Sequence, residues 1–311
     1  MTKPNHIPVL LQEVVKNALP ENGKVFVDAT FALGGHTNAI LEKYPQIQTV
    51  VAIDQDEQIL KHSLNTCTDN RVQRFHSQAS ELPQILSLAN IHKADGILLD
   101  LGVSSFQLDT ADRGFSFTNP GKLDMRMDST QSLDAIKVVN EYEQSKLIEI
   151  FRKYGEERFA KRIAQFIIKE RESNPIITTD HLASIVKKAI PAKFSANKST
   201  HPATKVFQAI RIEVNDELQE LQSFLDIAID CLNPNGHLSI ISFHSLEDRI
   251  VKKHFKLLEQ GCKCPGNFPV CVCNNKPAAK SLNKKAIFAQ ESEIANNPRS
   301  RSARLRSLKK L

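Results

Sequence analysis

Two adjacent glycines mark the first place where this sequence can hold a ligand. Residues 24–30 form a short apolar run containing an acid, and Gly34-Gly35 lie just before a helical stretch that begins at about Thr37. Glycines let a backbone approach a ligand closely, and the start of a helix offers free N–H groups. The patterns G-x-G-x-x-G and G-x-x-x-x-G-K-S/T are both absent here, so a pyrophosphate ligand is disfavoured.

Two acids at the ends of later strands indicate which cofactor would bind at this turn. Asp54 ends the second apolar run, about twenty residues after the glycine pair, where a carboxylate accepts hydrogen bonds from ribose hydroxyls. Asp100 ends another run and enters a Gly-Val-Ser-Ser turn. The set favours S-adenosylmethionine over NAD, because S-adenosylmethionine has a ribose and two cationic groups but no phosphate. Each feature alone is weak, since an acid at a strand end is often only a helix cap.

The elements that must position these residues alternate along the chain. Five apolar runs are expected to be strands: residues 24–30, 49–54, 71–76, 94–100 and 237–243. Helical stretches follow the first two, at residues 37–43 and 56–65. Such alternation predicts an α/β fold with a parallel, doubly wound sheet. In that fold ligands bind beyond the carboxyl ends of the strands, where the glycine turn and the acids would lie.

A helical block interrupts the alternation. Between residues 109 and 202 the pattern predicts no strand and four helices, at residues 133–140, 143–154, 156–172 and 179–190. Residues 206–231 then form one long helix or two, and residues 233–236 a turn. Ser245 begins a capping-box-like start of the next helix, which favours an N-cap over a nucleophile. The block is near domain size and indicates an insertion.

Charge is unevenly distributed over the 311 residues, whose net charge is +6. Residues 274–311 hold ten basic and two acidic residues, a net charge of +8, and the remaining chain carries −2. Between Asp180 and Glu213 there is no acid, and this stretch holds Lys187, Lys188, Lys193, Lys198, Lys205 and Arg211. Two basic zones on a mildly acidic body suggest a nucleic acid partner, with plain solvated surface as the alternative. We expect residues 296–311 to be mobile in isolation.

The composition, 41% hydrophobic and 24% charged, is that of a globular protein. No apolar run is long enough to span a membrane, and residues 1–8 lack the apolar part of a secretory signal. We therefore expect a cytoplasmic protein, with no membrane contact and with reduced thiols. Four of the thiols, Cys262, Cys264, Cys271 and Cys273, are spaced C-x-C, six residues, C-x-C, which is tighter than usual zinc spacing. Free thiols are favoured over zinc, so no metal is assigned.

Longer strings now identify a family. In order they are His6-Ile7-Pro8-Val9-Leu10-Leu11, Gly34-Gly35-His36-Thr37, Asp95-Gly96-Ile97-Leu98-Leu99-Asp100-Leu101-Gly102-Val103-Ser104-Ser105, Arg113-Gly114-Phe115-Ser116-Phe117, Leu123-Asp124-Met125-Arg126-Met127-Asp128, Tyr154-Gly155-Glu156-Glu157-Arg158, His201-Pro202-Ala203-Thr204, Phe207-Gln208-Ala209-Ile210-Arg211 and Ser242-Phe243-His244-Ser245-Leu246-Glu247-Asp248-Arg249. On these strings the chain closely resembles the bacterial small-subunit ribosomal RNA methyltransferase H family, also called MraW, up to about residue 255. The ending Asn297-Pro298-Arg299-Ser300-Arg301-Ser302 also resembles that of the family.

The resemblance implies a class I methyltransferase fold with an inserted helical domain. Residues 1–108 and 203–311 would form the methyltransferase domain, and residues 109–202 a substrate-recognition domain. The methyl donor would be S-adenosyl-L-methionine and the acceptor the exocyclic N4 of one cytidine in the decoding region of 16S rRNA, in the small ribosomal subunit. The cofactor contacts carried over by position are Gly34, Gly35, His36, Asp54, Ala79, Asp100 and Gln107. Ala79 departs from the family's aromatic residue, so a backbone contact survives there but stacking is weakened.

The reaction needs the reacting atoms to be aligned more than it needs a strong base. The cytosine N4 lone pair is delocalised, and the methyl group on the sulfonium is already activated, so the main task is to line up nitrogen, carbon and sulfur. We expect Ser104 and Ser105 to accept hydrogen bonds from the amine of a base turned out of its stack, and Asp100 to face the cofactor. His244 is a third candidate for substrate positioning, although a helix-capping role is the stronger interpretation. Arg126 could hold a phosphate or pair with its neighbouring acids.

Other functions stay open at this point. A methyltransferase of the same fold could act on a protein or a small molecule, and the basic stretch in the insertion speaks against that. A non-enzymatic RNA-binding assembly factor is disfavoured by the intact glycine turn and acids, and a dehydrogenase by the missing third glycine. The sequence does not indicate the oligomeric state.

Overall fold

The computed structural model describes residues 7–194, 201–261, 264, 273 and 275–311, and the chain divides into two units. The sheet unit comprises Met1–Gly102 and Gln219–Leu311, and the helical unit comprises Val103–Leu218. The predicted second boundary, at residues 202/203, differs from this division because helix α10 (Thr204–Asn215) packs into the helical core through Val206, Phe207 and Ile210. The cysteine cluster, for which free thiols are expected, lies partly outside the described residues, because Cys262 and Cys271 do.

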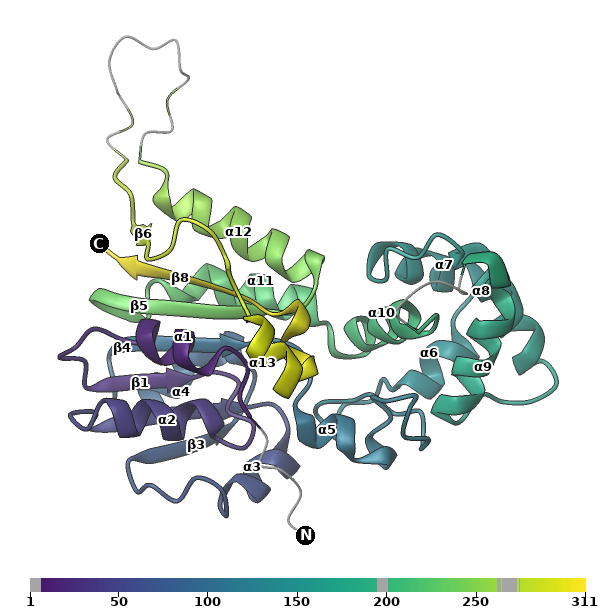
Figure 1. The fold of residues 1–311 in the computed structure, drawn as a ribbon, viewed down its shortest axis with the longest axis horizontal. Helices are drawn as coiled ribbons and strands as arrows, with labels where there is room; N and C mark the ends of the chain where they lie inside the picture. The colour runs from purple at the N-terminus through teal and green to yellow at the C-terminus, as the bar shows by residue number, and fades with distance from the viewer. Residues whose placement is uncertain (1–6, 195–200, 262–263, 265–272, 274) are drawn as a thin grey trace. The chain divides into compact units, whose positions relative to one another are not determined.

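In its described part, the sheet unit has one eight-stranded sheet of order β3-β2-β1-β4-β5-β8-β6, with β7 paired to β8 (Figure 1). The strands are β1 (Val25–Asp28), β2 (Thr49–Asp54), β3 (Val72–His76), β4 (Ala94–Asp100), β5 (Leu232–Ser242), β6 (Ala279–Ser281), β7 (Ile287–Phe288) and β8 (Arg304–Lys310). The five predicted strands are confirmed, and β1 to β5 pair in parallel. Their carboxyl ends therefore meet at one edge of the sheet.

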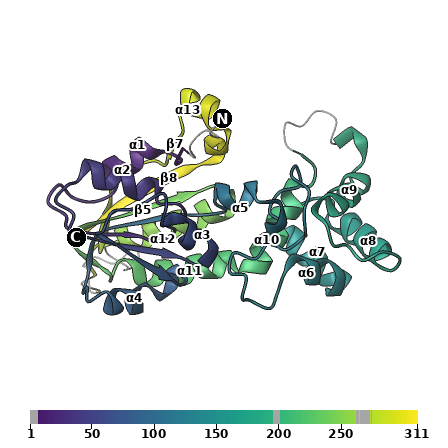
Figure 2. The same ribbon diagram turned by 90° about the horizontal axis from the view of Figure 1, so that it is seen from below.

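Helices cover both faces of this sheet, as expected for a doubly wound fold (Figure 2). Successive strand residues alternate between two cores: Phe26 and Leu98 belong to the one with α1 (Leu11–Asn17) and α2 (Gly35–Lys43). Val27 and Leu99 belong to the other, with α4 (Leu82–Leu88), α11 (Glu217–Ala228) and α12 (Ser245–Glu259). The remaining elements are α3 (Glu57–Ser63), the 3-10 turn η1 (Ala79–Glu81), α13 (Glu291–Asn296) and the 3-10 turn η4 (Pro298–Ser302).

The expectation that residues 296–311 are mobile is wrong. They contain η4 and β8, and β8 runs antiparallel between β5 and β6, so the sheet is not purely parallel. Leu305 and Leu308 are fully buried. The basic residues around them, Arg304, Arg306, Lys309 and Lys310, hide this strand pattern in the sequence, but several of these side chains have partners inside the unit. Lys310 Nζ, for example, donates to the carbonyls of Ile229 and Leu232, at 2.8 Å each. The +8 charge of this segment is therefore partly structural.

The helical unit has the predicted helices and no strand in its described residues, apart from an isolated bridge between Lys122 and Thr178. Its elements are α5 (Ser105–Asp109), η2 (Ala111–Arg113), α6 (Ala135–Glu141), α7 (Gln144–Lys153), α8 (Ala160–Arg171), α9 (Thr179–Ala189), η3 (Ala192–Phe194) and α10. The predicted stretch 206–231 proves to be two helices, because Asp216 adopts a left-handed conformation with φ of 48°. The predicted turn at residues 233–236 is an irregularity within β5, where the register with β4 shifts.

The loop that enters the helical unit contains the predicted pair of Arg126 with a neighbouring acid. Arg126 pairs with Asp124 in two hydrogen bonds, of 2.7 and 2.8 Å, and also donates to the carbonyls of Ser129 and Gln131. This confirms the internal ion pair. The guanidinium nitrogens of Arg126 are occupied by these contacts, so they are not available to a phosphate.

Among the helices that the structure describes, none is long and apolar enough to cross a membrane.

Asp248 of α12 forms ion pairs with two arginines of β8, and these pairs are expected to stabilise the fold. It accepts from Arg306 at 2.7 Å and from Arg304 at 3.0 Å. Burial raises the pKa of Asp248, but the hydrogen bonds and charges of the two arginines outweigh burial and hold the pKa below its ordinary value. We expect Asp248→Asn to lower the free energy of unfolding by about 2 kcal/mol at pH 7, measured by urea denaturation. Because the folded pKa is depressed, this loss should shrink as the pH falls below about 4.

The exposed pair of Glu57 and Lys61 provides the matched control, since both side chains are more than half exposed. Glu57→Gln should change stability by less than about 0.5 kcal/mol. Equal effects of the two substitutions would contradict the role of Asp248.

Candidate functional site

The glycine turn connects β1 to α2 and needs both of its glycines. Gly34 has φ of 76°, a left-handed conformation that suits glycine, and a Cβ there would lie 2.7 Å from Cβ of Cys67. A Cβ on Gly35 would lie 2.5 Å from Cγ of Pro8. No side chain of the N-cap residue Gly34 caps the start of α2. Packing within the protein therefore requires both glycines, and the close approach of a ligand to this turn stays a prediction.

Asp54 ties the end of β2 to this turn. Its Oδ2 accepts from the backbone N–H of Ala32 at 2.8 Å, and its Oδ1 accepts from that of Asp56 at 2.9 Å. Burial raises the pKa of Asp54 to about 7, with further upward contributions from Asp56 and Asp28. Each carboxylate oxygen has a second lone pair, so ribose hydroxyls can still donate to it.

Asp100 ends β4 and has an unsatisfied oxygen. Its Oδ1 is buried without a hydrogen-bond partner among the described residues, and its Oδ2 lies 3.8 Å from Nδ1 of His36. Burial raises the pKa of Asp100 well above its ordinary value, and the negative charges of Asp28 and Glu247 raise it further. A buried carboxylate in this condition is stabilised by a cation or a strong donor.

Asp28 belongs to the same group, although the sequence analysis gave it no role. It is 2% exposed, and its Oδ2 accepts from the hydroxyl of Thr37 at 2.7 Å. Its Oδ1 has no partner within the described parts of the chain, and burial raises its pKa to about 6. The available signal was an acid in the apolar run just before the glycine turn. Three carboxylates with raised pKa values thus end β1, β2 and β4 at one sheet edge.

Ala79 begins η1 and is buried in the core that contains Ile53 and Leu99. The loop before it is joined to β2, because Ser77 donates its N–H to the carbonyl of Asp54 at 3.1 Å. Glu220, also missed by the sequence analysis, accepts from the N–H and the hydroxyl of Ser80 at 2.8 and 2.6 Å. A methyl group in the core offers no ring for stacking, so only the backbone at residue 79 suits a base.

Ser104, Ser105 and Gln107 belong to the helical unit, where they start α5. Ser104 is the N-cap: its Oγ accepts from the N–H of Gln107 at 3.2 Å, and Gln107 Oε1 accepts from the N–H of Ser104 at 3.0 Å. Ser105 and Gln107 are 7% and 3% exposed. This reciprocal capping box accounts for Ser104 and Gln107 structurally, and their proposed contacts to amine and cofactor stay predictions.

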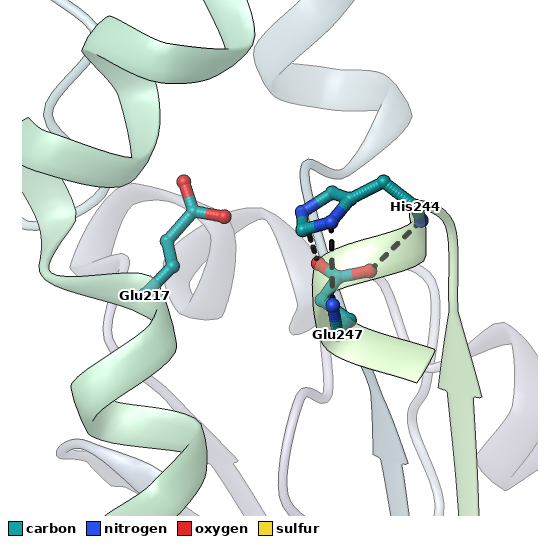
Figure 3. A group of neighbouring side chains, drawn as sticks. All are labelled: Glu217, His244 and Glu247. Atoms are coloured by element: carbon teal, nitrogen blue, oxygen red, sulfur yellow. Dashed lines mark hydrogen bonds and ion pairs between the residues drawn. The ribbon is translucent and has the colours of Figure 1, made fainter. Parts of the chain in front are cut away.

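His244 is the N-cap of α12, which confirms its capping interpretation (Figure 3). Its Nδ1 accepts from the N–H of Glu247 at 3.4 Å, and its Nε2 lies 3.0 Å from Oε1 of Glu247. Glu247, only 2% exposed, accepts in return from the N–H groups of Phe243 and His244. The expectation that Ser245 is the N-cap is wrong by one residue, because His244 is the last extended residue and Ser245 is already helical.

The sheet order with β8 reversed, the glycine turn after β1 and the acid at the end of β2 define a class I methyltransferase fold. The sequence matches the MraW methylase family over residues 3–311, and the chain belongs to that family. It is 47% identical to "Ribosomal RNA small subunit methyltransferase H" of Clostridium botulinum over 98% of this chain and 99% of that protein. A protein of the same name from Syntrophotalea carbinolica is 46% identical over 98% of each chain. Among solved structures, a putative rRNA methylase from Clostridium thermocellum aligns with 97% of this chain and 95% of that chain, at 9% identity and a TM-score of 0.43.

The raised pKa of Asp54 predicts a pH-dependent affinity for the adenosyl group. If Asp54 binds the ribose, a hydroxyl donates to its ionised carboxylate, and the protonated fraction of Asp54 grows as the pH falls through about 7. We expect the Kd of S-adenosylhomocysteine, measured by calorimetry, to rise about tenfold between pH 8 and pH 6.

Two variants isolate the contribution of Asp54. Asp54→Asn should bind more weakly at pH 8 and show a flatter pH dependence. Asp69→Asn is the control, because hydrogen bonds from Arg71 hold the pKa of Asp69 at about 2, outside the tested range. An identical pH dependence in all three proteins would refute the assignment.

Proposed function

We propose that this chain transfers a methyl group from S-adenosyl-L-methionine to N4 of a specific cytidine in the decoding region of 16S rRNA. The observation that carries the proposal is the family match over residues 3–311, together with the 47% identity over 98% of the chain to a ribosomal RNA small subunit methyltransferase H. The site chemistry agrees with it: unsatisfied carboxylate oxygens lie at the strand ends, and no fingerprint for pyrophosphate is present.

The residues of the sheet unit fit the methyl donor. Asp54 is proposed to accept from its ribose hydroxyls, and the backbone of Gly34, Gly35 and Ala79 to approach it closely. Asp100, with His36 beside it, faces its cationic part, since the unpartnered Oδ1 and the raised pKa are both relieved by a positive charge. Bound S-adenosylmethionine supplies an already activated methyl group on a positively charged sulfur.

The remaining task of the protein is to position the amine. The lone pair of cytosine N4 must point along the line from methyl carbon to sulfur, which is a proximity and orientation effect. Ser104 and Ser105 are proposed to accept from the amine, and Gln107 to contact the cofactor. The hydroxyl oxygen of Ser104 already accepts from Gln107, so it would use its second lone pair. The target base must leave its stack to enter such a site.

The lysines of the helical unit are proposed to contact the RNA backbone. Lys187 and Lys188 end α9 and are exposed, as is Lys193 in η3, where its Nζ lies 5.1 Å from the ring centre of Phe194. Lys205 is exposed as well, although it donates to the carbonyl of Glu156, and Lys198 lies outside the described residues. Because the substrate is ribosomal RNA, we also propose that the protein acts in the cytoplasm on the small subunit.

Mass mapping of 16S rRNA tests the function itself. Small subunits from cells that lack this protein should gain one methyl group, on one cytidine of the decoding region, when incubated with the purified protein and S-adenosylmethionine. Asp100→Asn should lose most of this activity. Methylation at another position, or of a protein instead of RNA, would contradict the proposal, and comparing free rRNA with assembled subunits identifies the substrate form.

Single-turnover methylation by Ser104→Ala and Ser105→Ala tests the positioning role. Each missing acceptor should slow the methyl transfer step by about tenfold while leaving the Kd of S-adenosylhomocysteine nearly unchanged. Ser104→Asn is the matched control for the helix, since asparagine also caps a helix N-terminus. Wild-type rates in both alanine variants would remove the serine side chains from the mechanism.

A further inference from the structure

Both ends of the sheet unit converge on the glycine turn. Residues 7–10 lie against it, because a Cβ on Gly35 would lie only 2.5 Å from Cγ of Pro8. The C-terminal elements α13 and η4 lie beside α1 in both views (Figures 1 and 2) and hold this N-terminal segment at two points. Asn297 donates to the carbonyl of Ile7 at 2.9 Å, and Glu293 accepts from the N–H of Leu10 at 2.8 Å.

One peptide group links this clamp to the cofactor turn. The Val9 carbonyl and the Leu10 N–H belong to the same peptide, and the carbonyl lies 2.9 Å from Nε2 of His36. A carbonyl oxygen only accepts, so Nε2 carries the proton in this contact. The other ring nitrogen, Nδ1, lies 3.8 Å from Asp100. A continuous path thus runs from Glu293 through one peptide to His36 and Asp100.

The chemistry of this path indicates that Glu293 affects the ring of His36 and does more than hold the N-terminal segment in place. A carboxylate that accepts from a peptide N–H polarises the peptide, which makes its carbonyl a stronger acceptor for the His36 proton. Leu10 also has φ of 52°, a left-handed conformation that costs free energy for leucine and is kept only if its surroundings hold it. The hydrogen bond that Glu293, near the C-terminal end of the chain, accepts from Leu10 restrains this peptide.

We propose that Glu293 is a positioning residue for the cofactor site. Through the Val9–Leu10 peptide it fixes the ring of His36 with Nε2 protonated and Nδ1 turned to Asp100. Asn297 supports it by holding Ile7. The identity of the ligand, S-adenosylmethionine, rests on the proposed function, but the effect of Glu293 on His36 does not. The resemblance of residues 297–302 to the family's ending thereby gains a physical meaning, as part of the clamp.

The test uses the full-length chain and three variants. Glu293→Ala removes the acceptor, Glu293→Gln keeps a neutral acceptor, and Glu291→Ala removes an equal charge from an exposed position on the same helix. The first readout is the ¹⁵N NMR spectrum of the His36 ring in the ligand-free protein, with the exchange rate of its Nε2 proton. The second is the Kd of S-adenosylhomocysteine, and thermal unfolding verifies that each variant is folded.

We expect Glu293→Ala to speed exchange of the His36 proton and to weaken S-adenosylhomocysteine binding, each by about tenfold. Glu293→Gln should lie between Ala and wild type, and Glu291→Ala should match wild type. Unchanged His36 signals in Glu293→Ala would overturn the proposal, as would equal losses in Glu291→Ala. If the wild-type protein bound no S-adenosylhomocysteine, the proposed function would fail, while the His36 spectrum would still decide the role of Glu293.

Discussion

Three carboxylates with raised pKa values at one sheet edge are the constraint on which the rest of the site depends, and two of them, Asp28 and Asp100, keep an oxygen without a hydrogen-bond partner among the described residues. Asp28, Asp54 and Asp100 end neighbouring parallel strands, and burial raises the pKa of each. The negative charge of Asp28 raises the pKa of both Asp54 and Asp100, so a donor or a cation bound at this edge stabilises the ionised forms. We propose that S-adenosylmethionine does so in two ways, through its ribose hydroxyls and through its positive charge. The absence of a pyrophosphate fingerprint agrees, because phosphates would add negative charge to the same edge.

The rest of the sheet unit keeps these carboxylates in place. The parallel register of β1, β2 and β4 brings their ends to one edge, and Asp54 joins β2 to the glycine turn through Ala32. The antiparallel strand β8 completes the sheet and is fastened to α12 by Asp248 with two arginines. Since α13 and η4 lead into β8, this ordering of the C-terminus also places Glu293 and Asn297 against residues 7–10. Under our proposal, this contact between residues 7–10 and the C-terminal segment also positions His36.

The sequence predicted the parts of the structure that depend on local pattern. The alternating apolar runs identified β1 to β5, and they placed the glycine turn, Asp54 and Asp100 at the strand ends where the structure has them. It missed β8, because its buried leucines lie among arginines and lysines whose hydrogen-bond partners, such as Asp248, are far away in the chain. Asp28 and Glu293 were missed because the environment of Asp28 depends on burial and the contact of Glu293 with Leu10 spans most of the chain, which no local pattern shows. The N-cap of α12 is His244 and not the predicted Ser245, because the backbone remains extended for one residue longer than the sequence pattern indicated.

The most direct test of this account is to titrate the carboxyl carbons of Asp28, Asp54 and Asp100 by ¹³C NMR, with and without S-adenosylmethionine. The account predicts midpoints well above the ordinary aspartate range of about 4 in the free protein. It also predicts that the midpoints of Asp54 and Asp100 fall when the ligand binds, because the ligand favours their ionised forms. Ordinary midpoints in the free protein, or midpoints that do not move on binding, would contradict the claim that an unsatisfied carboxylate cluster selects the methyl donor.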